Sequence, residues 1–252
     1  AEALFQEVER SFTGMQELRR IATDIKNFRT GHLRIACLPA LSTGFVPSAI
    51  RQFLADYPST RIHLQTRSSS TVRIWVAAQQ FDFGFATPAA EIEGLISEPF
   101  LAGRGVCVLP VGHPLAGQHV IRPGDLQGQA FISLALEDPA RRKIDGVFEQ
   151  AGVERNIVVE TQYAMTICGL VQRGVGCTIL NPLTALDYVP LGLVLKPFEP
   201  AVTFEYMLYR PAHRPLSLVA RRFLELLCAE REQLAERGFV QPMPLPTWEF
   251  KR

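Results

Sequence analysis

Hydrophobic positions divide the chain into one long amphipathic segment and a series of shorter alternating ones. Over residues 2–28, apolar side chains recur every three or four positions, with charged side chains between them. The apolar positions are Leu4, Val8, Phe12, Met15, Leu18, Ile21 and Ile25. This spacing predicts a helix with one apolar face, which we expect to pack on the same helix of a second copy of the chain. Packing back on its own domain is the alternative.

After Gly31, short apolar runs alternate with segments of helical period. The runs predict strands at residues 33–38, 61–66 and 82–86. Between them, residues 45–57 and 71–79 have apolar side chains at helical spacing, and Pro58 ends the first of these helices. A β-α-β-α-β order of this kind is typical of a parallel sheet with right-handed crossovers.

The same alternation returns in the second half of the chain. Strands are predicted at residues 103–110, 130–136, 156–161, 176–180, 193–198 and 203–210. Helices are predicted at residues 139–152, 163–174 and 215–238, with short helical turns at residues 123–129 and after Asn181. We therefore expect two similar α/β halves, whose ligand would bind beyond the carboxyl ends of the strands, in the crevice between the halves.

Composition and charge exclude several classes of function. Lys and Arg total 26 and Asp and Glu total 25, so a net charge of +1 provides no broad basic surface for nucleic acid. The sequence contains no run of about 18 apolar residues, and no signal peptide is visible. We therefore expect neither a membrane span nor export.

The spacing of cysteine and histidine argues against metal and redox chemistry. The five cysteines lie among apolar residues and form no CxxC pair, so we expect buried, reduced thiols in a cytoplasmic protein. The five histidines have no metal-ligand spacing. Because the sequence also has no GxSxG motif and no nucleotide-binding glycine loop, we expect neither an enzyme nor a bound metal.

Hydroxyl and amide side chains, rather than charged ones, follow the predicted strands. The candidate ligand-binding residues are Ser42, Ser68, Ser69, Ser70, Thr87, Ser133, Gln162 and Asn181. Hydroxyls and unpaired N–H groups at helix starts bind anions, so a carboxylate is the expected ligand. Helix capping is the alternative for any one of these residues, but four consecutive hydroxyls at positions 68–71 exceed what one cap requires.

Four further features carry a charge or a titratable group. Asp82 is interpreted as a structural carboxylate at the start of a strand, and His113 as a turn residue. The basic run 141–143 is interpreted as a solvated helix face. Arg104 precedes a strand that links the halves, where a ligand carboxylate and a surface or hinge salt bridge are equal alternatives. The sequence therefore offers no clear catalytic group.

The order of motifs over residues 1–235 resembles the regulatory half of a LysR-type transcriptional regulator. The motifs are GHLRIACLPAL, FLADYP, Ser69–Val72, Asp82–Phe85, His113–Ala116 and GVGCTILNP. Six motifs in this order and spacing are specific, although none is so alone. The TRSSSTV and LVQRGVGCTILNP segments are similar to the branch of the family that responds to amino acids and opines. Departures from the family pattern are Gln79 in place of a glycine, Asn181 within the usual Leu-Pro, and the Pro-rich end.

The resemblance implies an α/β fold of two Rossmann-like subdomains of the periplasmic-binding-protein type, preceded by a long linker helix. The implied parts are residues 1–30 as the linker, 31–106 with 207–238 as subdomain I, 107–206 as subdomain II, and 239–252 as an extended C-terminal arm. The resemblance also implies a winged helix-turn-helix upstream of the linker. Because the sequence begins with Ala1 rather than Met, we expect a fragment or a processed product without that DNA-binding domain.

The function implied by the resemblance is effector sensing without a cofactor. Ser69 would contact the anionic group of a small-molecule effector such as an amino acid, an opine or another carboxylate. The cleft would be lined by Ser42, Ser68, Thr87, Ser133 and Gln162. Helix 2–28 and the regulatory domain would form a homodimer or homotetramer, the missing domain would bind DNA, and no membrane would be involved. Closure around the effector would change how the halves and subunits pack.

Two other functions remain open. A solute-binding protein for uptake of a small anionic metabolite shares the two-lobed plan, but it requires an export signal and a monomer. The apolar stripe of residues 2–28 and the free cysteines argue against it. A two-lobed enzyme requires a cofactor cysteine or a catalytic acid in the cleft. Only Asp82 and the cysteines are available, and both are interpreted as structural.

Overall fold

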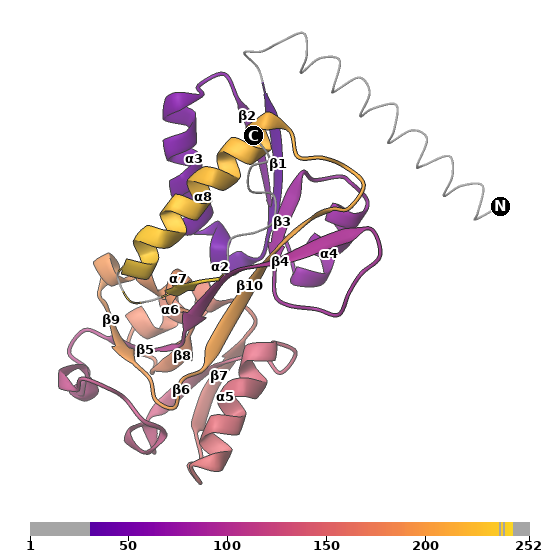
Figure 1. The fold of residues 1–252 in the computed structure, drawn as a ribbon. Helices are drawn as coiled ribbons and strands as arrows, with labels where there is room; N and C mark the ends of the chain where they lie inside the picture. The colour runs from indigo at the N-terminus through magenta and orange to yellow at the C-terminus, as the bar shows by residue number, and fades with distance from the viewer. Residues whose placement is uncertain (1–30, 237, 239, 244–252) are drawn as a thin grey trace.

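Two groups of strands, each with its own helices, form the part of the chain that the computed structural model describes, which is residues 31–236, 238 and 240–243 (Figure 1). The helix expected at residues 2–28, with its role in self-association, lies outside the described residues. None of the described helices is both long and apolar enough to cross a membrane.

The first sheet is built on three parallel strands, as the sequence predicted. Its strands, in spatial order, are β11 (Val240–Pro242), β4 (Leu95–Arg104), β10 (Thr203–Pro211), β3 (Phe83–Ala86), β1 (His32–Cys37) and β2 (Arg61–Thr66). Strand β1 runs parallel to both β2 and β3, and β10 and β4 run antiparallel to their neighbours. Helices α3 (Phe45–Asp56) and α8 (Leu218–Glu236) pack together on one face, and α4 (Ser69–Ala77) covers the other. The short helix α2 (Pro39–Ser42) follows β1.

The second group of strands is smaller. Strand β5 (Val106–Pro110) pairs antiparallel with β8 (Thr178–Leu180) and β9 (Leu193–Pro197), while β6 (Ala130–Leu134) pairs parallel with β7 (Asn156–Thr161). A bridge between Phe131 and Cys177 joins these two sheets. The helices are α5 (Pro139–Gln150), α6 (Ala164–Gln172) and α7 (Pro182–Leu186), with single turns η1 (Pro114–Gly117), η2 (Pro123–Leu126) and η3 (Val189–Leu191).

In the part of the chain that the structure describes, two passages connect the halves. The passages follow β4 and precede β10, and they are tied together where the Gly105 N–H donates to the Val202 carbonyl at 2.7 Å. The expectation of a single strand at residues 103–110 was wrong, because β4 ends at Arg104 and β5 begins at Val106. The long strand β4 was missed because Pro99 interrupts its pattern at a register shift in the pairing with β10, a position that tolerates proline. The subdomain boundaries given above stay a prediction.

The extended arm expected at residues 239–252 is described only in part. Val240–Pro242 form β11, which adds to the free edge of β4 with Val240 opposite Gly103 and Pro242 opposite Leu101. Arg231, near the end of α8, is fully buried and donates to the Phe100 carbonyl at 2.9 Å. The C-terminal segment therefore covers the strand that leads from one half to the other.

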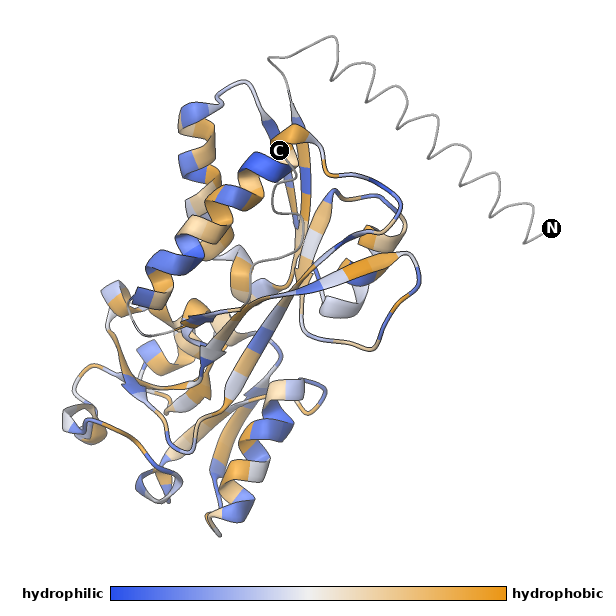
Figure 2. Ribbon diagram, in the orientation of Figure 1, coloured by the Kyte–Doolittle hydropathy of each residue, from blue (hydrophilic) through white to orange (hydrophobic). Residues whose placement is uncertain are grey.

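Hydrophobic residues are frequent in the strands, and the helices carry both hydrophobic and hydrophilic residues (Figure 2). Most of the buried residues are hydrophobic. Phe100 packs between Phe85 and Phe45, at ring-centre distances of 4.8 and 6.0 Å. None of the five cysteines forms a disulfide, and all but the half-buried Cys228 are buried. Burial raises the pKa values of the four buried thiols, to about 12 for Cys37, so these four stay protonated at neutral pH. This confirms their interpretation as small buried hydrophobic residues.

Candidate functional site

The candidate site of the first half lies where the three parallel strands end. The carboxyl ends of parallel strands meet at one edge of a sheet. Main-chain hydrogen bonds hold the segments that follow them, with the Leu38 N–H donating to the Phe85 carbonyl at 3.0 Å and the Arg67 N–H to the Cys37 carbonyl at 3.1 Å. The structure therefore brings α2, the start of α4 and Thr87 to one edge.

The hydroxyl run 68–71 forms a cluster at the start of α4. Ser68 caps the helix by accepting from the Thr71 N–H at 3.4 Å. Its oxygen also lies 3.0 Å from the Ser70 hydroxyl and 2.9 Å from the Thr71 hydroxyl. Capping thus accounts for Ser68 in part, while the side chains of Ser68 and Ser70 remain exposed to solvent.

Ser69 connects this cluster to the end of β3. Its hydroxyl oxygen accepts a hydrogen bond from the Thr87 N–H at 3.1 Å. The Thr87 carbonyl in turn accepts from the Tyr209 hydroxyl and from Nη1 of Arg73, both at 3.0 Å. A serine hydroxyl has one donor besides its acceptor positions. Ser69 is therefore fixed by an accepted bond and keeps its O–H available for an anion.

Arg73 is a charged residue that the sequence analysis missed. It follows Ser69 by four positions, so both side chains lie on one face of α4 and both hold Thr87. Its guanidinium lies 5.9 Å from the centre of the Tyr209 ring. Burial raises the pKa of Tyr209 and the Arg73 charge offsets part of this rise, so the phenol is protonated and donates at neutral pH. The i, i+4 spacing is the signal that would have identified Arg73.

Ser42 lies in the neighbouring loop, but its donor is already used. The hydroxyl donates to the Pro39 carbonyl at 3.0 Å within α2. An anion would have to displace this bond to gain a donor from Ser42. The structure therefore places Ser42 near the site without leaving its hydroxyl free.

The candidate residues of the second half are mostly buried. Ser133 on β6 is only 1% exposed, and Asn181, which is 5% exposed, caps α7 by accepting from the Thr184 N–H at 2.9 Å. Gln162, which follows β7, is exposed. Helix α7 contacts α2, so the loops that follow β8 and β1 meet at the boundary between the halves.

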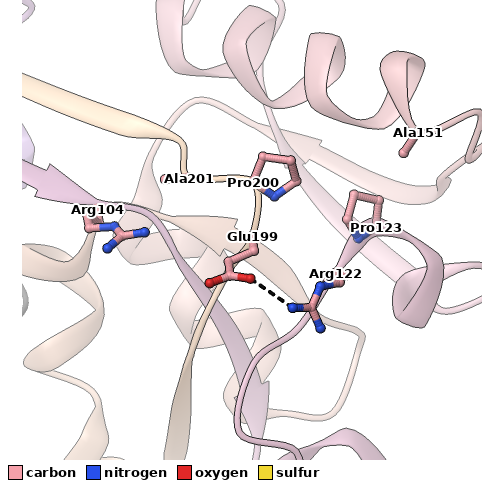
Figure 3. A pocket seen from close by; sticks show the side chains of 7 residues that line it. All are labelled: Arg104, Arg122, Pro123, Ala151, Glu199, Pro200 and Ala201. Atoms are coloured by element: carbon pink, nitrogen blue, oxygen red, sulfur yellow. Dashed lines mark hydrogen bonds and ion pairs between the residues drawn. The ribbon is translucent and has the colours of Figure 1, made fainter.

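A separate open hollow of about 480 Å³ lies mainly on the second half; it includes Arg104, at the end of β4, but none of the hydroxyl and amide candidates. It is lined by Arg104, Arg122, Pro123, Ala151, Glu199, Pro200 and Ala201 (Figure 3). Arg122 and Glu199 pair at 2.9 Å, with side chains that are 64% and 46% exposed. An exposed pair contributes little binding energy. The strand-end cluster therefore remains the better candidate for a small-molecule site.

The interpretations of Asp82 and His113 are confirmed. The Asp82 carboxylate is 4% exposed, accepts from the Arg34 N–H at 2.7 Å and pairs with Arg214 at 2.7 Å. Nδ1 of His113 accepts from the Leu115 N–H at 3.2 Å and caps η1. Both residues are structural.

The interpretation of residues 141–143 as a solvated face was wrong for Arg141. This side chain is buried, with Nε 2.7 Å from Asp145 and Nη1 2.7 Å from both Glu160 and the Leu134 carbonyl. Asp145 also pairs with Arg155. The error arose because Arg141 occupies the inner face of α5, together with Ile144 and Phe148, while its neighbours in the run are exposed. Among the described residues, no His, Cys, Asp and Glu side chains group as a metal site.

Comparisons with known proteins agree with this arrangement. The model of the LysR substrate binding domain family matches residues 26–231. The transcriptional activator protein LysR of Escherichia coli K12 is 40% identical over 220 residues, which are 87% of this chain and 71% of that protein. The octopine catabolism/uptake operon regulatory protein OccR of Rhizobium meliloti is 30% identical over 241 residues, or 95% of this chain and 80% of that protein.

A solved structure with the same fold is the BenM effector binding domain with its effector benzoate. It has 19% sequence identity and a TM-score of 0.67, covering 88% of this chain and 99% of that one. Such neighbours share the fold of two periplasmic-binding-protein-like subdomains, as expected from the sequence.

Proposed function

This chain belongs to the LysR family of transcriptional regulators, and on that premise we propose that its strand-end hydroxyl cluster binds the anionic group of a small effector. The chain is the effector-sensing domain of such a regulator and not an enzyme, and a solute-binding protein is not favoured. The relatives carry this conclusion, because fold alone does not determine function.

The observation that carries the proposal is the hydrogen bonding of Ser69. Its oxygen accepts from the Thr87 N–H at 3.1 Å, which fixes the side chain and leaves its O–H to donate. The start of α4 contributes N–H groups and a partial positive charge, and Arg73 adds a full one from the next turn. Donors held in place before binding lose little entropy when they meet a carboxylate.

We propose an amino acid, an opine or another small carboxylate as the effector. The relative OccR is named for octopine, and the BenM domain was solved with benzoate; both molecules carry carboxylates. In the second half, the exposed Gln162 would supply further donors, and the amide nitrogen of the buried Asn181 could do so only after a local movement. Ser133 would require a local movement to reach a ligand, because it is almost fully buried.

Sensing would follow from the effector binding one arrangement of the two halves better than another. Within the described residues the chain passes between the halves twice, after β4 and before β10, and a ligand held by both halves would shift their relative position. LysR-family regulators bind DNA and act as oligomers. For this chain, we propose a homodimer or homotetramer formed through residues 2–28 and the regulatory domain and acting in the cytoplasm.

Thermal denaturation with three related compounds tests the proposal. Octopine and L-arginine carry carboxylates, whereas L-argininamide keeps the guanidinium and lacks the carboxylate. We expect the carboxylate compounds to raise the melting temperature and the amide to leave it unchanged. Stabilisation by L-argininamide alone, or by none of the three at millimolar concentration, would contradict the proposed effector class.

Two serine variants locate the binding group. Replacing Ser69 with Ala removes a donor to a charged group, which weakens binding by roughly 10- to 100-fold. Ser42→Ala is the matched control, because the Ser42 hydroxyl already donates to Pro39 and contributes no free donor. Equal affinities of the Ser69 variant and the parent chain, measured by calorimetry, would show that the anion binds elsewhere.

A further inference from the structure

Gly44 and the side chain of Asp187 lie in contact although they belong to different halves. Gly44 directly precedes α3, and Asp187 directly follows α7. A methyl group built on Gly44 would lie 2.7 Å from Cγ of Asp187 and closer still to its carboxylate oxygens. Unbonded carbon atoms do not approach so closely. Position 44 therefore has no room for a side chain while Asp187 stays in place.

The requirement for glycine comes from space and not from the backbone. Gly44 has φ −118° and ψ −61°, with the negative φ that residues with side chains adopt. An alanine would thus be unstrained at this position apart from its overlap with Asp187. The contact between the halves, rather than the local chain, excludes a side chain here.

The contact lies beside the proposed effector site. Helices α2 and α7 touch, and they follow the carboxyl ends of β1 and β8, respectively. In Figure 1 both helices lie between the two groups of strands. Gly44 is two residues beyond Ser42, and Asp187 is at the opposite end of α7 from Asn181. Any change in separation at this contact would also move the loops that carry the candidate binding residues.

The Asp187 carboxylate also fits this position electrostatically. Helix α3 begins without a side-chain cap, because its N-cap residue is Gly44. A carboxylate from the other half lies at this helix start, where negative charge is favoured. Partial burial raises the pKa of Asp187, and the neighbouring Thr43 hydroxyl offsets part of that rise. The contact thus combines close packing with a partly desolvated charge.

We propose that Asp187 sets the separation of the two halves by packing against Gly44, and that it is a positioning residue for effector binding. The second part rests on the proposed function. A side chain at position 44 would hold the halves apart. The donors of the two halves would then no longer reach one small molecule together.

A double-mutant cycle tests the contact in the ligand-free chain. The four proteins are the parent chain, Gly44→Ala, Asp187→Ala and the double variant, with Gly146→Ala as control because a methyl group there meets no atom within 4 Å. We expect Gly44→Ala to lower the melting temperature by about 5 °C and to raise the radius of gyration in X-ray scattering. Asp187→Ala should reverse both effects in the Gly44→Ala background.

The variant Asp187→Asn separates size from charge. It keeps the volume of the side chain, so Gly44→Ala combined with Asp187→Asn should remain as expanded as Gly44→Ala alone. The contact would be refuted by a Gly44→Ala chain with the radius of gyration of the Gly146→Ala control. A defect that Asp187→Ala fails to relieve would refute it equally.

Octopine titrations test the link to the effector. Gly44→Ala should weaken octopine binding roughly tenfold, and Asp187→Ala should restore it in the double variant. Unchanged binding by an expanded Gly44→Ala chain would overturn the positioning role. If octopine binds none of the proteins, including the parent chain, it is the proposed effector that fails, and the ligand-free cycle still decides the contact.

Discussion

The side chains that follow the parallel strands differ between the two halves of the molecule. In the first half, Ser68 and Ser70 are exposed and Ser69 keeps an unused donor. In the second half, Ser133 and Asn181 are buried, and the side-chain oxygen of Asn181 accepts a hydrogen bond that caps helix α7. The strand topology is similar, so it is the side chains at the strand ends that make one half suited to binding an anion.

Ion pairs and hydrogen bonds occupy the ends of the parallel strands β6 and β7 in the second half. Arg141 joins the end of β6, through the Leu134 carbonyl, to Glu160 on β7 and to Asp145 on its own helix. Arg141 is buried and Glu160 is 41% exposed, and each of these charges is already compensated by its partner. The comparison suggests a division of roles, in which the second half supplies a rigid frame and the first supplies the anion-binding groups.

The largest effect should come from breaking that frame. Replacing Arg141 with Ala leaves Asp145 and Glu160 without a shared partner and the Leu134 carbonyl without a donor. We expect a loss of about 3 kcal/mol of unfolding free energy, measured by urea denaturation. Arg142→Ala is the control, since its side chain is exposed, and it should change stability by less than about 0.5 kcal/mol. Equal losses of unfolding free energy in the two variants would contradict the view that the second half serves as a rigid frame.

The helix caps Asn181 and Ser68 allow a direct comparison of the two halves, with a smaller expected effect on stability. Asn181→Ala leaves the buried Thr184 N–H without its acceptor, which should cost about 2 kcal/mol. Ser68→Ala removes a longer bond at an exposed helix start, where water replaces the hydroxyl, and should cost about 0.5 kcal/mol. Chemical denaturation of both variants measures the difference. A larger loss from Ser68→Ala would reverse the comparison.

A third contrast concerns the stability of the protein at alkaline pH. Burial raises the pKa to about 12 for Cys168 and about 11 for Cys177, in the second half, and to about 12 for Cys37 in the first. The ordinary thiol value is 9.0, so the unfolded chain loses these protons first. Stability present below pH 9 should therefore fall as the pH rises toward 12, by about 1 kcal/mol per thiol at pH 10.

Alanine variants show how much of this alkaline loss of stability comes from the thiols of each half. Replacing both Cys168 and Cys177 should flatten the fall in unfolding free energy between pH 9 and 11 about twice as much as replacing Cys37 alone. Urea denaturation at several pH values measures the slopes. A slope that none of the three substitutions alters would mean that other groups cause the alkaline loss.

Much of the fold followed from hydrophobic spacing. Strands β1, β2 and β3 and the helices between them were predicted because their apolar positions repeat at strand or helix period. Strand β4 was not, because Pro99 and a register shift break its pattern and its partner β10 is about 100 residues away. Pairing over such distances leaves little trace in local sequence.

The site was predictable in residue type but not in hydrogen bonding. The sequence indicated hydroxyls at 68–71, yet only the structure shows that Ser69 accepts from Thr87 while Ser42 donates to Pro39. Arg141 was misinterpreted because it lies on the inner face of α5, where its partner Glu160 is supplied by strand β7. The direction of a hydrogen bond depends on groups that the chain brings together only on folding.

Hydrogen–deuterium exchange with and without octopine tests most directly whether the first half holds the effector's anionic group. Binding at the hydroxyl cluster should slow exchange of the amides in residues 67–73 and at Thr87, with a smaller change near Gln162. Ser69→Ala should abolish the slowing and Ser42→Ala should preserve it. Protection confined to residues 133–145 of the second half, or protection that survives Ser69→Ala, would contradict the account.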